Sequence, residues 1–171
     1  MKLIEGKRLK ERLEQSPPLV EHFVDPETQI QMNGVDFTLR EVASFGDEPG
    51  AIDFDNSERR TPETAVIEPD DDGWWKLPPG SYWIVYNEVV NIPSDMFGMA
   101  RTRSSLLRNG AQIGTALWDS GYSGRSGSVL IVYHPAGIHL KRNARVLQLV
   151  FFELDAPAAK TYAGRYQNEN K

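Results

Sequence analysis

The segment W-D-S-G-Y-S-G-R-S-G, residues 118–127, places one carboxylate, Asp119, between a Trp and a run of Ser and Gly. An Asp before Ser-Gly is typical of a turn, because its short side chain bonds nearby backbone amides. The same carboxylate could act as a general base if it were fixed, partly buried and close to a bound phosphate. Trp118 and Tyr122 could bury it. The segment alone therefore allows a turn residue or a base that activates water for attack on phosphorus.

A second candidate segment lies upstream, where residues 101–108 read R-T-R-S-S-L-L-R. Guanidinium groups form charge-assisted, often bidentate bonds to phosphate oxygens, and Ser104 and Ser105 could add neutral donors. These residue types predict a polyphosphate site. The alternative is a solvated turn that ends at Asn109-Gly110.

Two polar residues interrupt apolar strand patterns. Asp36 lies in the segment 33–39, where burial would cost free energy unless the carboxylate is bonded. It is either a site residue or a strand-start Asp that bonds a backbone amide. Gln148, three residues after Arg145, lies in the middle of an apolar run. It indicates a ligand or subunit contact, or an ordinary edge position.

The composition is that of an ordinary globular domain. The 171 residues carry a net charge of −5 and no Cys. Disulfides, thiolate metal sites and Cys nucleophiles are excluded, and no basic footprint predicts stable nucleic-acid binding. No apolar run is long enough for a membrane span and no signal peptide is present, so we expect a cytoplasmic protein. The three His are scattered and do not form a metal set: His22, His134 and His139.

Turns and short β-like runs dominate the chain. One helix is predicted over 5–15, with Leu9 and Leu13 on one face, and Ser16-Pro17-Pro18 ends it. The pattern predicts a single all-β domain, 1–171, built as a sandwich, jelly roll or barrel with a short N-terminal helix within 1–16. Residues 45–62 are typical of a loop insertion, and 162–171 of a mobile tail. The predicted strands are 65–67, 74–77, 82–86, 89–92, 128–133 and 146–152.

The order of several segments resembles the dUTPase and dCTP deaminase superfamily, in particular its archaeal and viral-type branch. The matching segments cover about residues 33–167 and are G-V-D-F-T-L, R-S-S-L-L-R, W-D-S-G-Y-S-G, A-R-V-L-Q-L-V-F and Y-A-G-R-Y-Q. The resemblance implies a distorted β-barrel or jelly-roll subunit, usually a homotrimer with active sites between subunits.

The deaminases of this family keep a Glu on the strand after the Tyr-x-Gly turn. Val129 or Ile131 stands at that position here, depending on the loop alignment, and Arg125 follows the turn. Neither apolar residue can transfer a proton. Asp119, by contrast, matches the Asp that deprotonates the attacking water in dUTPases.

The resemblance therefore implies a dUTP diphosphatase in which Asp119 activates a water that attacks the α-phosphorus. Mg²⁺ would be carried on the triphosphate without a direct protein ligand, with Asp36 supporting its waters or the site geometry. Tyr122 would pack against deoxyribose, and backbone between Gly110 and Ala116, near Thr115, would read uracil. The implied phosphate and lid contacts are Arg103, Ser104, Ser105, Arg108, Arg145, a neighbouring subunit's Gln148, and the tail residues Tyr162, Arg165, Tyr166 and Gln167.

Some features match the deaminases instead. Arg108 matches an Arg that is important there, and the tail lacks the glycine-rich final motif of trimeric dUTPases. The alternatives are therefore a dCTP deaminase with a base elsewhere, a bifunctional deaminase and diphosphatase, and a nucleotide-binding regulator without turnover.

Overall fold

Antiparallel strands make up most of the computed structural model, which describes residues 1–171. The helices are α1 (Gly6–Leu13), α2 (Pro26–Gln29) and α3 (Ser104–Arg108). The strands are β1 (Lys2–Leu3), β2 (Val20–Glu21), β3 (Ile30–Gln31), β4 (Gly34–Phe45), β5 (Thr64–Val66), β6 (Trp74–Leu77), β7 (Gly80–Tyr86), β8 (Val89–Asn91), β9 (Met96–Thr102), β10 (Ala111–Gly114), β11 (Ser123–Gly124), β12 (Gly127–Val132), β13 (Ile138–Lys141) and β14 (Arg145–Glu153).

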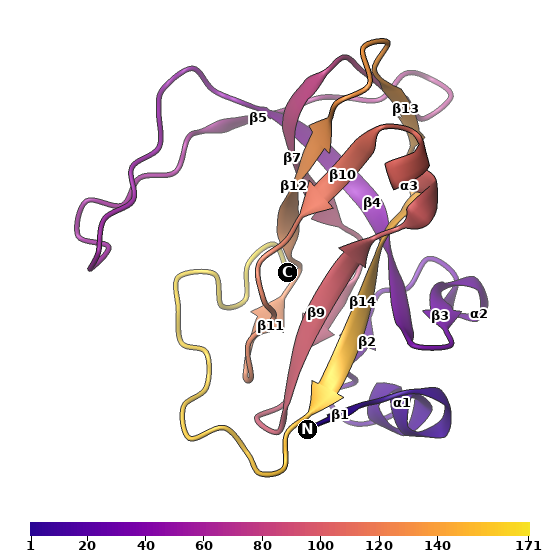
Figure 1. Ribbon diagram of the computed structural model, residues 1–171, viewed down its shortest axis with the longest axis vertical. Coiled ribbons are helices and arrows are strands. Elements are labelled where there is room, and N and C mark those ends of the chain that lie inside the picture. The colour runs from indigo at the N-terminus through magenta and orange to yellow at the C-terminus, as the bar shows by residue number, and fades with distance from the viewer.

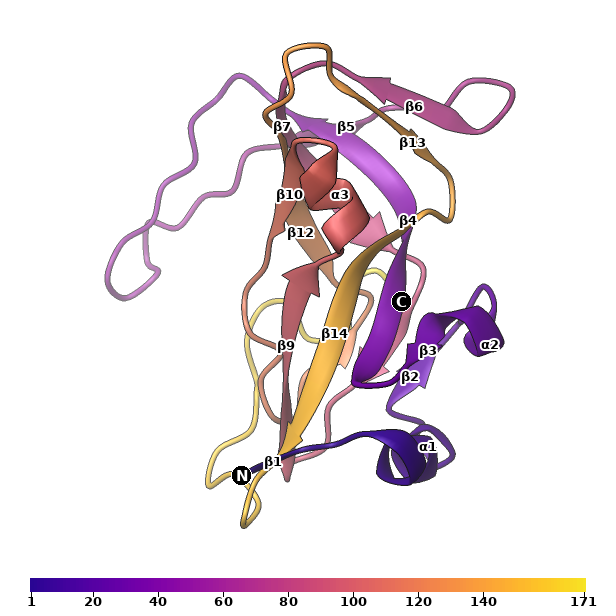
Figure 2. The ribbon, with the colours of Figure 1, turned by 45° about the vertical axis from the view of Figure 1, so that its right-hand side comes forward.

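The main sheet curls into part of a barrel (Figure 1). Its path runs β1-β14-β4-β7-β12-β10, with β3 and β5 paired to β4 and β9 paired to β14. Two smaller sheets, β11-β8-β2 and β13-β6, lie beside it, and Figure 2 shows the second of these at the end of the molecule opposite α1. The all-β, barrel-like prediction is confirmed.

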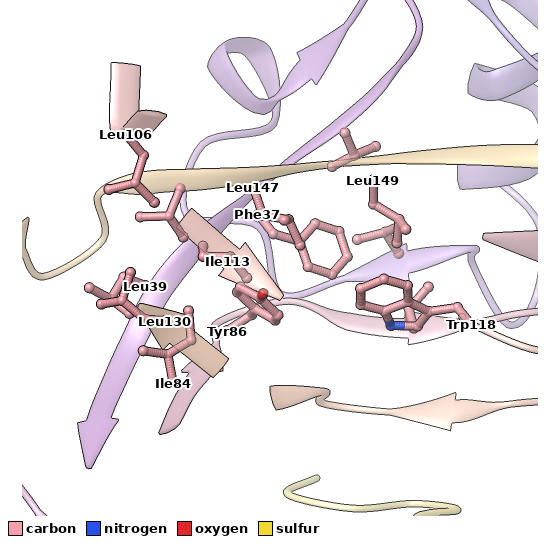
Figure 3. Close-up of a cluster of buried hydrophobic side chains, with 14 of the residues drawn as sticks. Phe37, Leu39, Ile84, Tyr86, Leu106, Ile113, Trp118, Leu130, Leu147 and Leu149 are labelled. Atoms are coloured by element: carbon pink, nitrogen blue, oxygen red, sulfur yellow. The ribbon is translucent and has the colours of Figure 1, made fainter. Parts of the chain in front are cut away.

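The core lies inside the curl, where β4, β7, β12 and β14 contribute apolar side chains (Figure 3). The Phe37 and Tyr86 rings meet edge to face at 5.5 Å between centroids. Leu147 and Leu149 are fully buried beside them. Every residue of β4 from Gly34 to Leu39 is buried, because neighbouring strands and side chains cover both faces. Because both faces of such a strand are removed from water, apolar side chains are favoured at successive positions, which explains the apolar runs in the sequence.

The N-terminal helix is confirmed and is shorter than predicted. Leu9 packs into the core, while Arg12 forms ion pairs with Asp95 (2.5 Å) and Glu153 (2.7 Å) that tie α1 to the end of β14. None of the helices has the length and apolar composition that crossing a lipid bilayer requires.

The six predicted strands correspond to β5, β6, β7, β8, β12 and β14, with ends shifted by at most two residues. The segment between β4 and β5 projects as a long arm (Figure 1), which confirms a loop over the residues predicted there. A single antiparallel bridge between Ala51 and Arg60 holds its two sides together. The sequence pattern missed the short strands β1, β2, β3 and β11, the strands β9, β10 and β13, and helix α2. It indicated only the first half of β4, and it missed that the Arg-Ser segment contains the short helix α3.

Candidate active site

Asp119 lies in a tight turn that leads from a bridge into β11. Trp118 pairs with Gly98 through two backbone hydrogen bonds of 2.8 and 3.1 Å, and the Tyr122 N–H donates to the Asp119 carbonyl at 3.0 Å. Gly121 takes a positive φ of 85°, a conformation that favours glycine. The turn interpretation is therefore correct for the backbone. Asp119 is exposed, so Trp118 and Tyr122 do not bury it as predicted.

A cavity of about 660 Å³ opens beside this turn. Asp119 and Tyr122 form part of its wall, and the arm and the tail close other sides. Its size lies within the range of roughly 300–1,000 Å³ that is typical of small-molecule sites. The remaining lining residues are Phe45, Thr61, Pro62, Thr64, Trp83, Ala116, Leu117, Trp118, Ser126, Gly127, Tyr162, Tyr166, Glu169 and Asn170.

The C-terminal tail docks against the Asp119 turn of its own subunit. The Gln167 amide accepts from the Ser123 N–H (3.0 Å) and donates to the Gly121 carbonyl (2.9 Å), so it bonds this edge as a further strand would. The Tyr122 hydroxyl donates to Glu169 at 2.8 Å. Tyr162 meets Tyr122 edge to face at 5.5 Å. Of the predicted lid residues, Tyr162, Tyr166 and Gln167 contact the turn or line the cavity, whereas Arg165 is exposed.

We expect the tail to dock more firmly at acidic than at neutral pH. Burial raises the pKa of Glu169, and the hydrogen bond from Tyr122 opposes part of that rise. The docked tail therefore binds a proton more tightly than the free tail. Docking is strongest below the ordinary glutamate pKa and weakens as the pH rises through the raised one. Amide exchange of residues 162–171, corrected for intrinsic rates between about pH 4 and 8, measures this.

Glu169→Gln provides the matched test, because the amide cannot ionise. Its tail protection should not change with pH. An unchanged pH dependence in this variant would show that another group controls docking.

The Arg-Ser segment is organised by α3. Arg103 stands at the start of the helix in extended conformation, and Leu106 anchors the helix in the core. Ser104 and Ser105 are left exposed on its first turn, as is Arg108 on its last. Gly110, with φ of 69°, ends the segment. Asn109-Gly110 after Leu-Leu-Arg is a helix-end signal that could have identified α3 from the sequence.

Asp36 holds two of the predicted phosphate ligands in place. Its buried carboxylate forms ion pairs with Arg103 (Nε–Oδ2, 3.1 Å) and Arg145 (Nη1–Oδ2, 3.2 Å). Burial raises the pKa of Asp36, and the two guanidinium groups oppose that rise. Since both oppositely charged partners are in direct contact, we treat the group as an ionised carboxylate. Asp36 is thus bonded to side chains, not to a backbone amide as the alternative required.

Gln148 lies on β14, directly opposite Asp36 on β4 and opposite Arg101 on β9. Residues directly opposite each other on paired strands point to the same face of the sheet, so Gln148 lies on the face that carries Asp36. Asp36 in turn contacts Arg103. That a neighbouring subunit's Gln148 contacts the triphosphate stays a prediction.

The predicted site residues fall into two groups within one subunit. Ser105 and Arg145 line a second cavity of about 450 Å³, together with His134 and His139, and Asp119 is not part of it. Thr115 lines neither cavity, and of the predicted uracil-reading backbone only Ala116 reaches the first one. The predicted water-activating residue Asp119 and two of the predicted phosphate ligands, Ser105 and Arg145, thus line separate cavities.

The strand that follows the turn carries no acid. Val129 and Ile131, the two residues predicted at the deaminase Glu position, are half-buried on β12. Arg125 is buried, and its guanidinium donates to the Asn170 carbonyl (2.9 Å) and to the Asn87 carbonyl. It holds the tail and a loop in place and does not replace the missing acid.

Several cavity residues escaped the sequence-based analysis. The base of the arm and the pair Glu169 and Asn170 reach the cavity only through tertiary folding. No motif spacing predicted Trp83 or Ser126 either. The structure contains no cluster of three or more His, Cys, Asp or Glu residues with metal-binding geometry.

Comparison with known proteins identifies the family. A model of the dCTP deaminase-like family matches residues 3–154. The chain belongs to this family. Proteins named "Probable deoxyuridine 5'-triphosphate nucleotidohydrolase" are similar over almost the whole length. One from Methanosarcina mazei is 49% identical, with 99% of each chain covered, and one from Archaeoglobus fulgidus is 45% identical, with 99% of this chain and 98% of that one covered.

The fold of this dCTP deaminase-like chain is also found in a solved structure. The 2'-deoxycytidine 5'-triphosphate deaminase from Agrobacterium tumefaciens superimposes with a TM-score of 0.63 at 17% identity. The match covers 87% of this chain and 47% of the deaminase chain. At this identity the likeness concerns the fold alone.

Proposed function

We propose that this family member hydrolyses dUTP to dUMP and pyrophosphate. Relatives that are 49% and 45% identical along almost the full chain carry the name of this activity. The observation that carries the proposal is the pairing of an exposed Asp119 at a nucleotide-sized cavity with a β12 strand that has no acid. Phosphate hydrolysis has a candidate base here, whereas the β12 position of the family's deaminase Glu holds no acid.

In the proposed reaction, Asp119 takes a proton from a water as that water attacks the α-phosphorus. A bond forms between the water oxygen and the α-phosphorus, and the bond from that phosphorus to the oxygen bridging to the β-phosphate breaks. Pyrophosphate leaves with the electron pair. Arg103, Ser104 and Ser105 bind the phosphates and stabilise the leaving charge. Tyr122 packs against deoxyribose, as the resemblance implies.

The donor set of the chain suits a magnesium ion that arrives on the substrate. The Asp36 carboxylate is already paired with two guanidinium groups. Mg²⁺ prefers oxygen ligands and retains its waters, so the triphosphate itself would hold it. When bound, the ion would neutralise phosphate charge.

We further propose that a complete site needs two subunits of a homotrimer. Two observations support this. Asp119 and Ser105 line different cavities, and Asp119 is exposed to bulk solvent in the single chain. A neighbouring subunit would bring its Arg-Ser face to the Asp119 cavity and cover the carboxylate. The tail would complete the closure over the triphosphate.

Incubation with dUTP and with dCTP, followed by product analysis, tests the function. We expect dUMP and pyrophosphate from dUTP and no ammonia from dCTP. Ammonia, or dUTP formed from dCTP, would assign a deaminase or bifunctional activity. Tight binding of dUTP without any pyrophosphate release would identify a regulator.

Asp36→Asn should lower kcat/KM for dUTP by about 10–100-fold while the chain remains folded. The neutral amide keeps the volume of the side chain but no longer attracts Arg103 and Arg145, so the phosphate ligands lose their fixed positions. Steady-state kinetics with a circular-dichroism check measures this.

Asp70→Asn is the matched control for the loss of an ion pair, since it breaks the exposed contact with Lys76 (2.8 Å) outside both cavities. Equal effects of the two substitutions would show that Asp36 has no positioning role.

A further inference from the structure

One glutamine ties the segment that precedes β4 to the main sheet. Of residues 21–33, only Gln29 is buried, at 1% exposure. The other residues of α2 and β3 are half-buried or exposed, and both elements stand to the side of β4 (Figure 2). A buried polar side chain needs hydrogen-bond partners, so the partners of Gln29 show what this side chain holds in place.

The side-chain amide of Gln29 uses its full hydrogen-bonding capacity. Its Oε1 accepts from the backbone N–H groups of Val24 (2.8 Å) and Asp25 (2.9 Å). Its Nε2 donates to the Asp36 carbonyl (2.9 Å) and to the Glu88 carboxylate (2.6 Å). Backbone N–H groups can only donate and a carbonyl can only accept, so the orientation of the amide is fixed. The amide therefore joins the start of α2 to β4 and to the turn between β7 and β8.

Glu88 is the anchor for this tie. It is fully buried, and its carboxylate also accepts from the Thr38 N–H (2.9 Å) and the Thr38 hydroxyl (2.5 Å). Thr38 lies on β4, two residues beyond Asp36. Gln29 thus bonds β4 directly at Asp36 and again through a carboxylate that β4 itself holds.

The segment held by Gln29 supplies one of the two acceptors of Arg145. The Arg145 Nη1 donates to the Thr28 carbonyl (2.9 Å) and to Asp36 Oδ2 (3.2 Å). Thr28 directly precedes Gln29, and Asp36 is the residue whose carbonyl the Gln29 amide binds. Because that amide joins the backbone of both acceptors, it sets the distance between them. Arg145 lines the same cavity as Ser105 of the Arg-Ser segment.

We propose that Gln29 is a positioning residue for nucleotide phosphate: it fixes the two acceptors that hold the Arg145 guanidinium. A guanidinium that is already held loses little rotamer freedom when a phosphate binds to it. This inference rests on the proposed function, in which Arg145 is a phosphate ligand. Gln29 lies outside every segment that the sequence-based analysis selected.

A double-mutant cycle separates positioning from simple stabilisation. Calorimetric titration with α,β-imido-dUTP and Mg²⁺ gives the affinities of wild type, Gln29→Met, Arg145→Ala and the double variant. Met keeps the volume of the side chain and makes none of the amide hydrogen bonds. Gln29→Met should bind the nucleotide about tenfold more weakly, because a mobile guanidinium has to be ordered on binding. In the Arg145→Ala background it should cause no further loss, since two residues that act through one contact are not additive. Two losses that multiply would overturn the inference.

Two further variants control for folding. Glu88→Gln alters the tie from its anchor and leaves Gln29 in place, so the same cycle can be run with it where Gln29→Met does not fold. It should again show no further loss in the Arg145→Ala background. Tyr82→Phe removes another buried donor to a backbone carbonyl, that of Pro78 (2.8 Å), outside both cavities, and should keep the wild-type affinity.

A readout without nucleotide tests the inference apart from the proposed function. Phenylglyoxal modifies guanidinium groups, and peptide mass spectrometry gives the rate at Arg145. That rate should be about 2–10-fold higher in Gln29→Met than in wild type or Tyr82→Phe, the factor that corresponds to one lost hydrogen bond. An unchanged rate in folded Gln29→Met would contradict the positioning role. A raised rate in a protein whose wild type neither binds nor hydrolyses dUTP would instead refute the proposed function and leave the link from Gln29 to Arg145 intact.

Discussion

Asp119→Asn is expected to slow dUTP hydrolysis by about 10²–10⁴-fold, the range typical of a lost general base. The amide has nearly the same size as the carboxylate, so the turn from Trp118 to Tyr122, which is held by backbone hydrogen bonds, should persist. Asn cannot accept the proton of the attacking water. The affinity for α,β-imido-dUTP should stay within a few-fold of wild type, because the carboxylate acts on water and does not bind the nucleotide. Single-turnover kinetics and calorimetry separate the two effects.

Asp72→Asn is the control, since it changes another exposed turn aspartate that lies outside both cavities. It should retain wild-type rates. If Asp119→Asn remained fully active, the base would have to be another group. Asp119 would then be an ordinary exposed turn residue.

Mixed oligomers of two inactive variants are expected to regain activity. Arg103→Ala removes a phosphate ligand from the Arg-Ser face and should by itself lower kcat by about 10²-fold. If Asp119 and Arg103 meet across a subunit boundary, some sites in a mixed oligomer combine two intact halves. Random 1:1 assembly should restore up to about a quarter of the wild-type rate, because each site needs the intact residue from each of two subunits.

The control mixture combines Asp119→Asn with Tyr122→Ala, which alter the same half of the site. It should stay inactive. Recovery in the first mixture alone supports an inter-subunit site. If confirmed mixed oligomers showed no recovery, both halves would have to come from one chain, and the separation of the two cavities would have to close by movement within the subunit.

Six of the fourteen strands and the N-terminal helix could be predicted from the sequence, because they rest on local patterns. Short runs of β-branched and aromatic residues marked the strands from Tyr82 to Tyr86 and from Val146 to Phe152, and Pro17 marked the end of the helix. Helix α3 was missed because its Leu106 anchor is set by tertiary packing, and a five-residue helix has too few turns to show a period.

The sequence by itself determined the chemistry that is available. It showed an aspartate in a turn, an Arg-Ser segment, and no acid on the strand after the turn, since these are properties of residue types and order. Only the tertiary structure decided which of these groups meet. It paired Gln148 with Asp36 through strand register, and it placed Asp119 and Ser105 at different cavities. It also brought Ser126 to the Asp119 cavity. The physical reason is that a site forms from contacts between residues far apart in the chain, and local sequence patterns do not encode those contacts.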